Sequence, residues 1–179
     1  DRINTANAYG GPLLAMKTVN ELLGLNISRY ASVNFQGFME VVNLLGGVEL
    51  TLSDGEARLT GAEKSDQPQR LNGYQTLEYA RIRSLDNNFG RNERQRKVLS
   101  TLLEQARAQD RDTVMRAVTE GLGWMQTNLT AEEVLSLVVK ALGSQQDIEL
   151  LSLPPEGKYR FARSKSGASV IEFNQNTVR

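Results

Sequence analysis

Six cationic side chains between residues 81 and 97 are the groups in this sequence best suited to chemistry. They are Arg81, Arg83, Arg91, Arg94, Arg96 and Lys97. The same stretch holds only two acidic residues, Asp86 and Glu93, so it carries a local excess of four positive charges. Because guanidinium groups bind phosphate oxygens through paired hydrogen bonds, such a cluster is typical of a site for a phosphorylated ligand.

Part of the cluster has the spacing of one helix face. Arg91, Arg94 and Gln95 lie at positions i, i+3 and i+4, and the same stripe continues with Val98 and Leu102. A cation near a helix start opposes the macrodipole at a cost of about 0.3–1 kcal/mol, whereas a bound anion reverses that sign. The stripe begins with anion-binding groups and continues as aliphatic surface, which suits an amphiphile with a charged head and an apolar tail.

The same pattern has an alternative interpretation. Arginines on a helix are often a solvated face paired with acidic neighbours, and Glu93 and Glu104 are available for that purpose. From the pattern alone, a solvated face and an anion site both remain open. The acidic residues Glu56, Glu63 and Asp66 lie in a polar segment, and we expect their side chains to be solvated.

Composition excludes several classes of function. The chain of 179 residues has 21 basic and 21 acidic side chains and contains neither cysteine nor histidine. Disulfides, thiol nucleophiles, Ser-His triads and imidazole-bound zinc are therefore absent. The balanced charge also argues against a chain-wide attraction to nucleic acid. Chemistry must rest on carboxylates, arginine, lysine, tyrosine, hydroxyl groups, backbone amides or a cation bound to oxygen.

The elements that would position the cluster alternate between helix and strand. The pattern predicts a helix over 12–23, a strand over 27–35, a helix over 38–45 and a strand over 48–52. Residues 53–70 are polar and show no clear period. A helix capped by Asn72 then runs to about residue 80, and a turn-rich loop over 84–90 leads to a longer helix over 91–108. This order indicates an α/β fold.

The last third of the chain continues the mixed pattern. We expect a helix over 114–125, a helix from 131 preceded by the capping-box spacing of Thr130 and Glu133, and a strand over 148–153. A hairpin of 159–162 and 168–173 follows. No internal repeat or linker is evident, so residues 1–179 are predicted to form a single domain.

Several motifs taken together resemble the LytR-CpsA-Psr family. Leu71-Asn-Gly-Tyr-Gln-Thr-Leu-Glu-Tyr-Ala-Arg-Ile-Arg83 is similar to the family pattern L-N-G-x-x-A-L-x-Y-x-R-x-R. Asn88-Phe-Gly-Arg-Asn-Glu-Arg-Gln95 is similar to its D-F-x-R-x-x-R-Q. Upstream, residues 2–11, 33–38 and 45–48 resemble the family's K-I-N, strand–helix and G-G-V segments in the same order.

The resemblance implies a fold and an activity. The family fold is a three-layer α/β/α arrangement with a mixed central sheet. Its members are envelope enzymes on the outer face of the bacterial cytoplasmic membrane, usually anchored by one N-terminal helix. They transfer teichoic acid, capsule or related glycopolymers from an undecaprenyl-pyrophosphate carrier to peptidoglycan, and some show pyrophosphatase activity. A non-catalytic binder of polyprenyl pyrophosphate is the alternative, and a nucleic-acid partner is not expected.

The resemblance also assigns site residues. Arg81 and Arg83 match the family's R-x-R, and Arg91, Arg94 and Gln95 match its R-x-x-R-Q, so all five are expected to bind pyrophosphate. Arg83 and Arg91 are predicted to be catalytic, because they would offset the charge that moves during phosphoryl transfer. Val98 and Leu102 continue the stripe and are predicted to line a lipid-tail pocket.

The sequence departs from the family pattern in two ways. The family's R-x-D and P-R-D motifs, which supply its Mg²⁺-binding carboxylates and another phosphate-binding arginine, are expected to precede Asp1, together with the membrane helix. Mg²⁺ is therefore implied, with ligands outside this sequence. Asn88 stands where the family usually has aspartate, and an amide can neither act as a base nor bring negative charge to a metal. Asp86, two residues earlier, could compensate.

Overall fold

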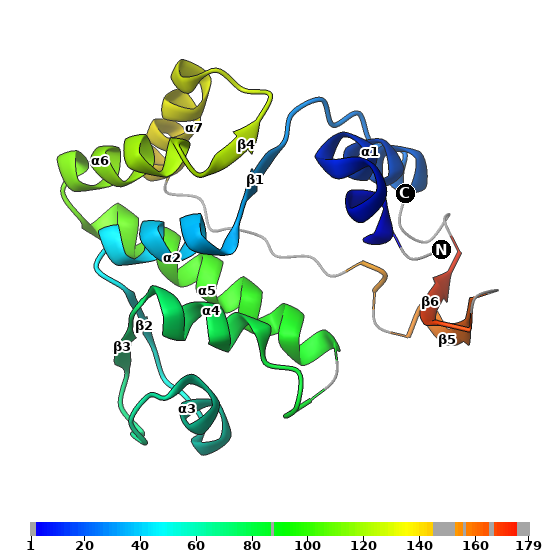
Figure 1. Ribbon diagram of the computed structural model, residues 1–179, viewed down its shortest axis with the longest axis horizontal. Helices are drawn as coiled ribbons and strands as arrows, with labels where there is room; N and C mark the ends of the chain where they lie inside the picture. Colours follow the sequence, from blue (N-terminus) through cyan, green and yellow to red (C-terminus); the bar gives the residue numbers. More distant parts are fainter. Residues whose placement is uncertain (1–2, 87, 145–152, 156, 165–166, 175–179) are drawn as a thin grey trace. The chain divides into compact units, whose positions relative to one another are not determined.

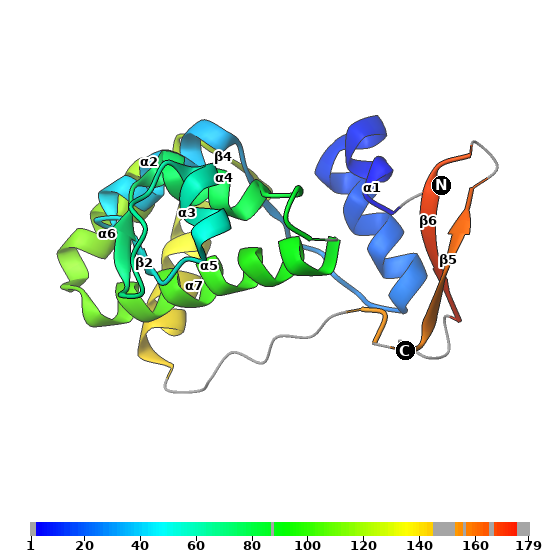
Figure 2. The same cartoon turned by 90° about the horizontal axis from the view of Figure 1, so that it is seen from below.

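The computed structural model describes residues 3–86, 88–144, 153–155, 157–164 and 167–174. Along the chain (Figure 1 and Figure 2) the elements are α1 (Thr5–Leu23), β1 (Ala31–Val33), α2 (Phe35–Leu44), β2 (Val48–Leu50), α3 (Asp54–Thr60), β3 (Gln69–Leu71), α4 (Gly73–Arg81), α5 (Asn88–Ala108), α6 (Arg111–Leu122), β4 (Met125–Thr127), α7 (Ala131–Gly143), β5 (Tyr159–Arg163) and β6 (Ser169–Phe173). The chain divides into a larger unit, residues 33–126 and 130–148, and a smaller unit, residues 1–32, 127–129 and 149–179.

The larger unit contains the whole cationic cluster and has its own core. β2 and β3 pair antiparallel, with Val48 opposite Leu71, and both side chains are buried while Glu49 between the core positions is exposed. The core is completed by side chains from the surrounding helices and loops, and its members are Val42, Val48, Leu50, Leu52, Ala57, Leu71, Tyr79, Ile82 and Val98. Ile82 and Val98 connect this core directly to the cationic cluster.

Side-chain caps fix where α2, α3, α4, α6 and α7 of the larger unit begin. Asn34, Ser53, Asn72, Asp110 and Thr130 each accept a hydrogen bond from a backbone N–H in the first turn of the following helix. Three of these caps are reciprocal capping boxes. The starts predicted at Asn72 and Thr130 are confirmed. The helix that follows Ser53 lies in a segment predicted to lack a regular period, and α3 corrects that expectation.

α4 lies among the other helices of the larger unit, since it packs against α2, α3 and α5 (Figure 2). It begins at Gly73, whose backbone lies so close to α2 that a Cβ atom there would overlap the carbonyl of Met39. The Gly73 N–H donates to Asn43 Oδ1 at 2.7 Å. Glycine at this position therefore lets α4 start against α2 and directs its other end toward the cationic cluster.

The smaller unit contains α1 and the β5–β6 hairpin. α1 is interrupted by non-helical backbone angles at Gly10 and Gly11. The hairpin pairs Tyr159 with Phe173 and is close to the boundaries predicted from sequence. In the same unit, the Asn128 side chain accepts from the Tyr30 N–H at 3.0 Å.

The α/β class is confirmed, with differences in detail. The described strands are three to five residues long and pair as β1–β4, β2–β3 and β5–β6, so they form three small sheets in place of one mixed central sheet. The strand predicted over 27–35 shortens to β1, because Phe35 already begins α2. Met125, expected in a helix, starts β4. Most of the strand predicted over 148–153 lies outside the described residues.

Candidate functional site

A pocket of about 710 Å³ lies where α4 ends and α5 begins. Its lining residues are Phe35, Leu59, Glu78, Arg81, Ile82, Arg83, Ser84, Arg91 and Gln95. Four of the five residues predicted to bind pyrophosphate are therefore brought to one cavity. Three guanidinium groups face a single carboxylate among the lining residues, and the volume is that of a small-molecule site.

Arg81 is held at the pocket by two different contacts. Its guanidinium carbon lies 4.8 Å from the centroid of the Phe35 ring, which is a cation–π geometry. Its Nη1 atom donates to Glu78 Oε1 at 3.0 Å, one helical turn earlier on α4. Both side chains of this pair retain solvent exposure, so the pair orients Arg81 more than it stabilises the fold.

Arg83 and Arg91 are the pocket cations without such partners. Within the described part of the chain, neither guanidinium forms a side-chain hydrogen bond or an ion pair. Gln95, one turn after Arg91 on α5, donates from Nε2 to the Ala80 carbonyl at 3.2 Å, which joins α5 to the last turn of α4. Two guanidinium groups are thus available to an anion that enters the pocket.

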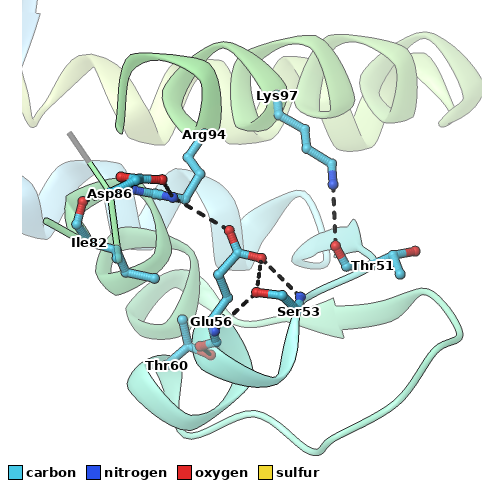
Figure 3. Close-up of polar contacts among 8 residues, drawn as sticks. All are labelled: Thr51, Ser53, Glu56, Thr60, Ile82, Asp86, Arg94 and Lys97. Carbon is cyan, nitrogen blue, oxygen red and sulfur yellow. Dashed lines mark hydrogen bonds and ion pairs between the residues drawn. The ribbon is translucent and has the colours of Figure 1, made fainter. Parts of the chain in front are cut away.

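Arg94 is not among the residues that line this pocket, and its side chain extends toward Ile82, Asp86 and Glu56 (Figure 3). Its side chain is only 6% exposed. Nη1 and Nη2 donate to the two carboxylate oxygens of Asp86, each at 2.7 Å, and Nη2 also donates to the Ile82 carbonyl at 2.9 Å. This arrangement differs from the expectation that Arg94 faces pyrophosphate, because Asp86 and a carbonyl already occupy its guanidinium.

Glu56 completes the environment of Arg94 from α3. Its Oε1 lies 3.6 Å from Arg94 Nη1, and its Oε2 accepts from the Ser53 N–H and hydroxyl, both at 2.9 Å (Figure 3). The expectation that Glu56 is solvated is wrong, since 15% of its side chain is exposed and it faces a buried cation. The Ser53–Glu56 capping-box spacing was the sequence signal for this position.

The pKa values of Asp86, Arg94 and Tyr79 are shifted by their mutual contacts and by burial. Hydrogen bonds from Arg94 hold the pKa of Asp86 below its usual range, and the same hydrogen bonds raise the pKa of Arg94. Burial raises the pKa of Tyr79 to about 12, and the Glu56 charge adds to that increase. The ion pair therefore stays ionised near neutral pH, while Tyr79 stays neutral and packs inward, where it is 2% exposed.

The two aliphatic residues of the predicted lipid-tail pocket lie elsewhere. Val98 is 2% exposed and belongs to the core, and Leu102 packs against that core. Neither lines the pocket at the arginines, whose apolar wall consists of Phe35, Leu59 and Ile82. The inward packing of Val98 follows from its position on the side of α5 that faces β2. A lipid-tail pocket at Val98 and Leu102 stays a prediction.

The described residues do not assemble a metal site. No group of three or more Asp or Glu side chains that could hold a metal ion occurs among them. Two carboxylates of this region are already paired, Asp86 with Arg94 and Glu78 with Arg81. These residues therefore do not fit the implied Mg²⁺, and we derive no step through it. The side chain of Asn88 lies outside the described part of the structure.

Comparison of the sequence with known proteins identifies a family and its relatives. A model of the LytR_cpsA_psr family matches residues 1–178. The chain is 30% identical over 182 residues to the regulatory protein MsrR of Staphylococcus aureus, covering 98% of this chain and 55% of MsrR. It is 32% identical over 168 residues to the polyisoprenyl-teichoic acid–peptidoglycan teichoic acid transferase TagU of Oceanobacillus iheyensis, covering 88% and 52%. The chain thus spans about half the length of these relatives.

The fold is also found among solved structures. The crystal structure of B. subtilis TagT is similar with a TM-score of 0.80 at 25% identity, over 99% of this chain and 67% of TagT. A structure of TagT bound to LIIa-WTA is similar with the same TM-score of 0.80 at 26% identity. None of the helices in the described residues has both the length and the apolar character required to cross a membrane.

Proposed function

Because the chain belongs to the LytR-CpsA-Psr family, we propose that it forms part of a glycopolymer transferase of the cell envelope. The donor in this proposal is a polyprenyl-pyrophosphate-linked glycopolymer, and the acceptor is a sugar hydroxyl of peptidoglycan. Its relative TagU, which is named a polyisoprenyl-teichoic acid–peptidoglycan teichoic acid transferase, supports a polyisoprenyl-linked glycopolymer as donor and peptidoglycan as acceptor. TagT bound to LIIa-WTA supports a wall glycopolymer as the ligand.

The observation that carries the proposal is the pocket at the junction of α4 and α5. Arg81, Arg83 and Arg91 supply three guanidinium groups to the lining of a cavity of about 710 Å³. Phe35 and Leu59 supply large apolar side chains to the same lining, and each is more than 40% exposed. A ligand with a charged diphosphate and an adjoining hydrocarbon chain matches both properties.

The chain's own residues would act on the phosphoryl group by charge and by position. The acceptor hydroxyl oxygen bonds to the phosphorus that carries the glycopolymer, and the bond from that phosphorus to the bridging oxygen breaks. The products are a phosphodiester and polyprenyl monophosphate, which takes the hydroxyl proton. Arg83 and Arg91 bind the diphosphate oxygens and stabilise the charge that collects on the leaving phosphate.

Arg81 and Gln95 have supporting roles in this proposal. Arg81 is already oriented by Phe35 and Glu78, so it offers a fixed positive group at one end of the pocket. Gln95 is oriented through the Ala80 carbonyl and presents its amide to a neighbouring oxygen of the ligand. Bringing the ligand to these preset groups lowers the ordering cost of binding.

We further propose where the protein works. An acceptor in peptidoglycan requires the site to lie in the cell envelope, on the outer face of the cytoplasmic membrane. The anchoring helix and the Mg²⁺-binding carboxylates that the family resemblance implies remain predictions. Capsule polysaccharide and other envelope glycopolymers are alternative cargoes of the same pocket, and pyrophosphate hydrolysis would follow if water replaced the acceptor hydroxyl.

The proposal is tested by the substitution Arg91→Ala. Removing one guanidinium from a site that stabilises moving charge costs about 2–4 kcal/mol in the transition state, which is about a 30-fold to 1,000-fold loss of rate. We expect glycopolymer transfer to peptidoglycan by the full-length protein to fall by that factor. Arg91→Lys should recover part of the loss, because it restores the charge without the two-pronged geometry.

The matched control is Arg116→Ala on α6. Arg116 is exposed, lies outside the pocket lining, and forms no ion pair with another described residue. The Arg116→Ala variant should transfer glycopolymer at the wild-type rate. Wild-type transfer by Arg91→Ala would refute the assignment of this pocket.

A second candidate function is a binder that holds the same polyprenyl pyrophosphate without turnover. Glu78 is the carboxylate among the pocket-lining residues, and its ion pair with Arg81 leaves it poorly placed to accept a proton. The two functions separate in one measurement, in which donor, acceptor and Mg²⁺ are supplied together. Stable binding with no released polyprenyl phosphate would favour the binder.

A further inference from the structure

Arg94 differs from the other arginines of the cluster in what its guanidinium contacts. Both of its terminal nitrogens are taken up by Asp86, the Ile82 carbonyl and Glu56, and its Nε is buried without a hydrogen-bond partner among the described atoms. A guanidinium surrounded by two carboxylates has no charge left to offer a diphosphate. Its contacts therefore call for a different role.

The partners of Arg94 lie on both sides of a pocket residue. The Ile82 carbonyl precedes Arg83 by one residue, and Asp86 follows it by three. Arg94 thus ties the segment between α4 and α5 to the body of α5 at two points (Figure 3). Arg83 lies between those two points, and Arg91 follows on the first turns of α5.

Gly90 provides independent support for this arrangement. A Cβ atom at position 90 would overlap the Asp86 carboxylate. The backbone of α5 therefore leaves room for that carboxylate beside Arg94, and a side chain at position 90 would require the carboxylate to shift.

We propose that Arg94 is a positioning residue that holds the Asp86 carboxylate away from the pocket and fixes the segment carrying Arg83. Asp86 is close in sequence to both Arg83 and Arg91, the pocket cations without partners. A carboxylate released from Arg94 would pair with one of them and compete with the diphosphate for the same nitrogens. Holding that carboxylate on a buried guanidinium keeps both pocket arginines open to the ligand. The ligand in this inference rests on the proposed function, whereas the structural role does not.

The decisive experiment is a double-mutant cycle on Arg94 and Asp86, read as the dissociation constant of inorganic pyrophosphate by calorimetry. Arg94→Met should weaken binding at least tenfold, because Asp86 is then free to occupy the pocket arginines. Adding Asp86→Asn should return the constant to within about threefold of wild type, because the competing charge is gone. Arg116→Met on α6 is the matched control and should bind as wild type does.

A direct ligand would behave differently. If Arg94 itself bound the diphosphate, the double variant would remain as weak as Arg94→Met, since the lost guanidinium is not restored by removing Asp86. That result would overturn the proposal while leaving the arginine pocket and its proposed function intact.

A second measurement needs no ligand and covers the case in which Arg94→Met does not fold. Gly90→Ala keeps every charge and displaces only the Asp86 carboxylate. Amide hydrogen exchange over residues 82–92 should become faster in Gly90→Ala, while exchange in α4 stays at the wild-type rate. Unchanged exchange over 82–92 would refute the positioning role. If wild type bound no pyrophosphate but the exchange result held, the proposed function would fail and the positioning role would stand.

Discussion

The hydroxyl of Tyr79 lies among charged groups of the site while remaining neutral itself. Tyr79 is 2% exposed, and burial, together with the charges of Glu56, Glu93 and Asp86, raises its pKa to about 12, against a smaller opposing effect of Arg94. In the unfolded chain the hydroxyl ionises near pH 10. The unfolded state therefore releases this proton first as the pH rises.

This difference predicts how stability depends on pH. The contribution of neutral Tyr79 is fully present below pH 10 and is lost as the pH rises through the folded pKa of about 12. Each pKa unit between the folded and unfolded states corresponds to about 1.4 kcal/mol, so the free energy of unfolding should fall by at most about 3 kcal/mol between pH 10 and pH 12. Urea unfolding of wild type and Tyr79→Phe between pH 8 and 12 measures the effect by difference.

The control is Tyr74→Phe, at a position that is 61% exposed. This variant should retain the wild-type loss of stability above pH 10, whereas Tyr79→Phe should show a smaller loss. Equal losses in wild type and Tyr79→Phe would contradict the assignment of the raised pKa to this residue.

At the same scale, the sequence predicted which residue types form the site but not which way each one points. At 3.6 residues per turn, Arg94 is rotated from Arg91 by about 60° in one direction and Gln95 by about 40° in the other. Because of this angular difference, Arg91 and Gln95 line the pocket while Arg94 and Val98 turn toward the core. The orientation depends on where α5 contacts β2 and α4, which the spacing within α5 does not contain.

Among the secondary-structure elements, α3 is a helix that the apolar pattern of the sequence did not predict. Its seven residues are too few to show an apolar period, and the segment before β3 is polar, so residues 53–70 gave no helical signal. The local capping chemistry of Ser53 and Glu56 was present in the sequence, and it became informative only with Arg94 opposite. By contrast, α7 has both a capping box and a repeating apolar stripe, and its start was predicted correctly.

The approach of α4 to α2 at Gly73 leads to a prediction about folding. Gly73→Ala would place a Cβ atom against the Met39 backbone, so one of the two helices must shift. Such overpacking costs about 1–3 kcal/mol, and we expect the free energy of unfolding to fall by that amount in urea titrations. Because α4 carries Arg81 at its other end, pyrophosphate binding should weaken as well.

The matched control for this substitution is Gly143→Ala at the end of α7. A Cβ atom at position 143 has no neighbour within 4 Å. Since alanine is the better helix former, this variant should be as stable as wild type or up to about 1 kcal/mol more stable. A Gly73→Ala protein as stable as Gly143→Ala would show that α2 and α4 are not packed as closely as described.

For the molecule as a whole, the distribution of charge, more than the net charge, determines which anionic ligands can bind. The chain has equal numbers of basic and acidic side chains, yet a local excess of positive charge is concentrated in one short segment. In the structure, three cations of that segment line a pocket next to apolar side chains, and a fourth is neutralised inside the protein. A small, highly charged ligand can reach such a site, whereas a long polyanion requires cations spread over an extended surface.

Duplex DNA binding tests this distinction, and it matters because the relative MsrR is named a regulatory protein. A protein that binds DNA non-specifically has a dissociation constant of about 10⁻⁴–10⁻⁶ M at physiological salt, and each phosphate contact adds about −0.9 to the salt slope. Even if Arg81, Arg83 and Arg91 all contacted phosphates, the slope would be only about −3. We therefore expect fluorescence anisotropy with a labelled duplex to show binding weaker than about 10⁻⁴ M, while pyrophosphate still binds under the same conditions. Tight DNA binding with a steeper salt slope would contradict this expectation, because it would require a cationic surface beyond this pocket. In that case Arg91→Ala would abolish the affinity for pyrophosphate and leave the affinity for DNA almost unchanged.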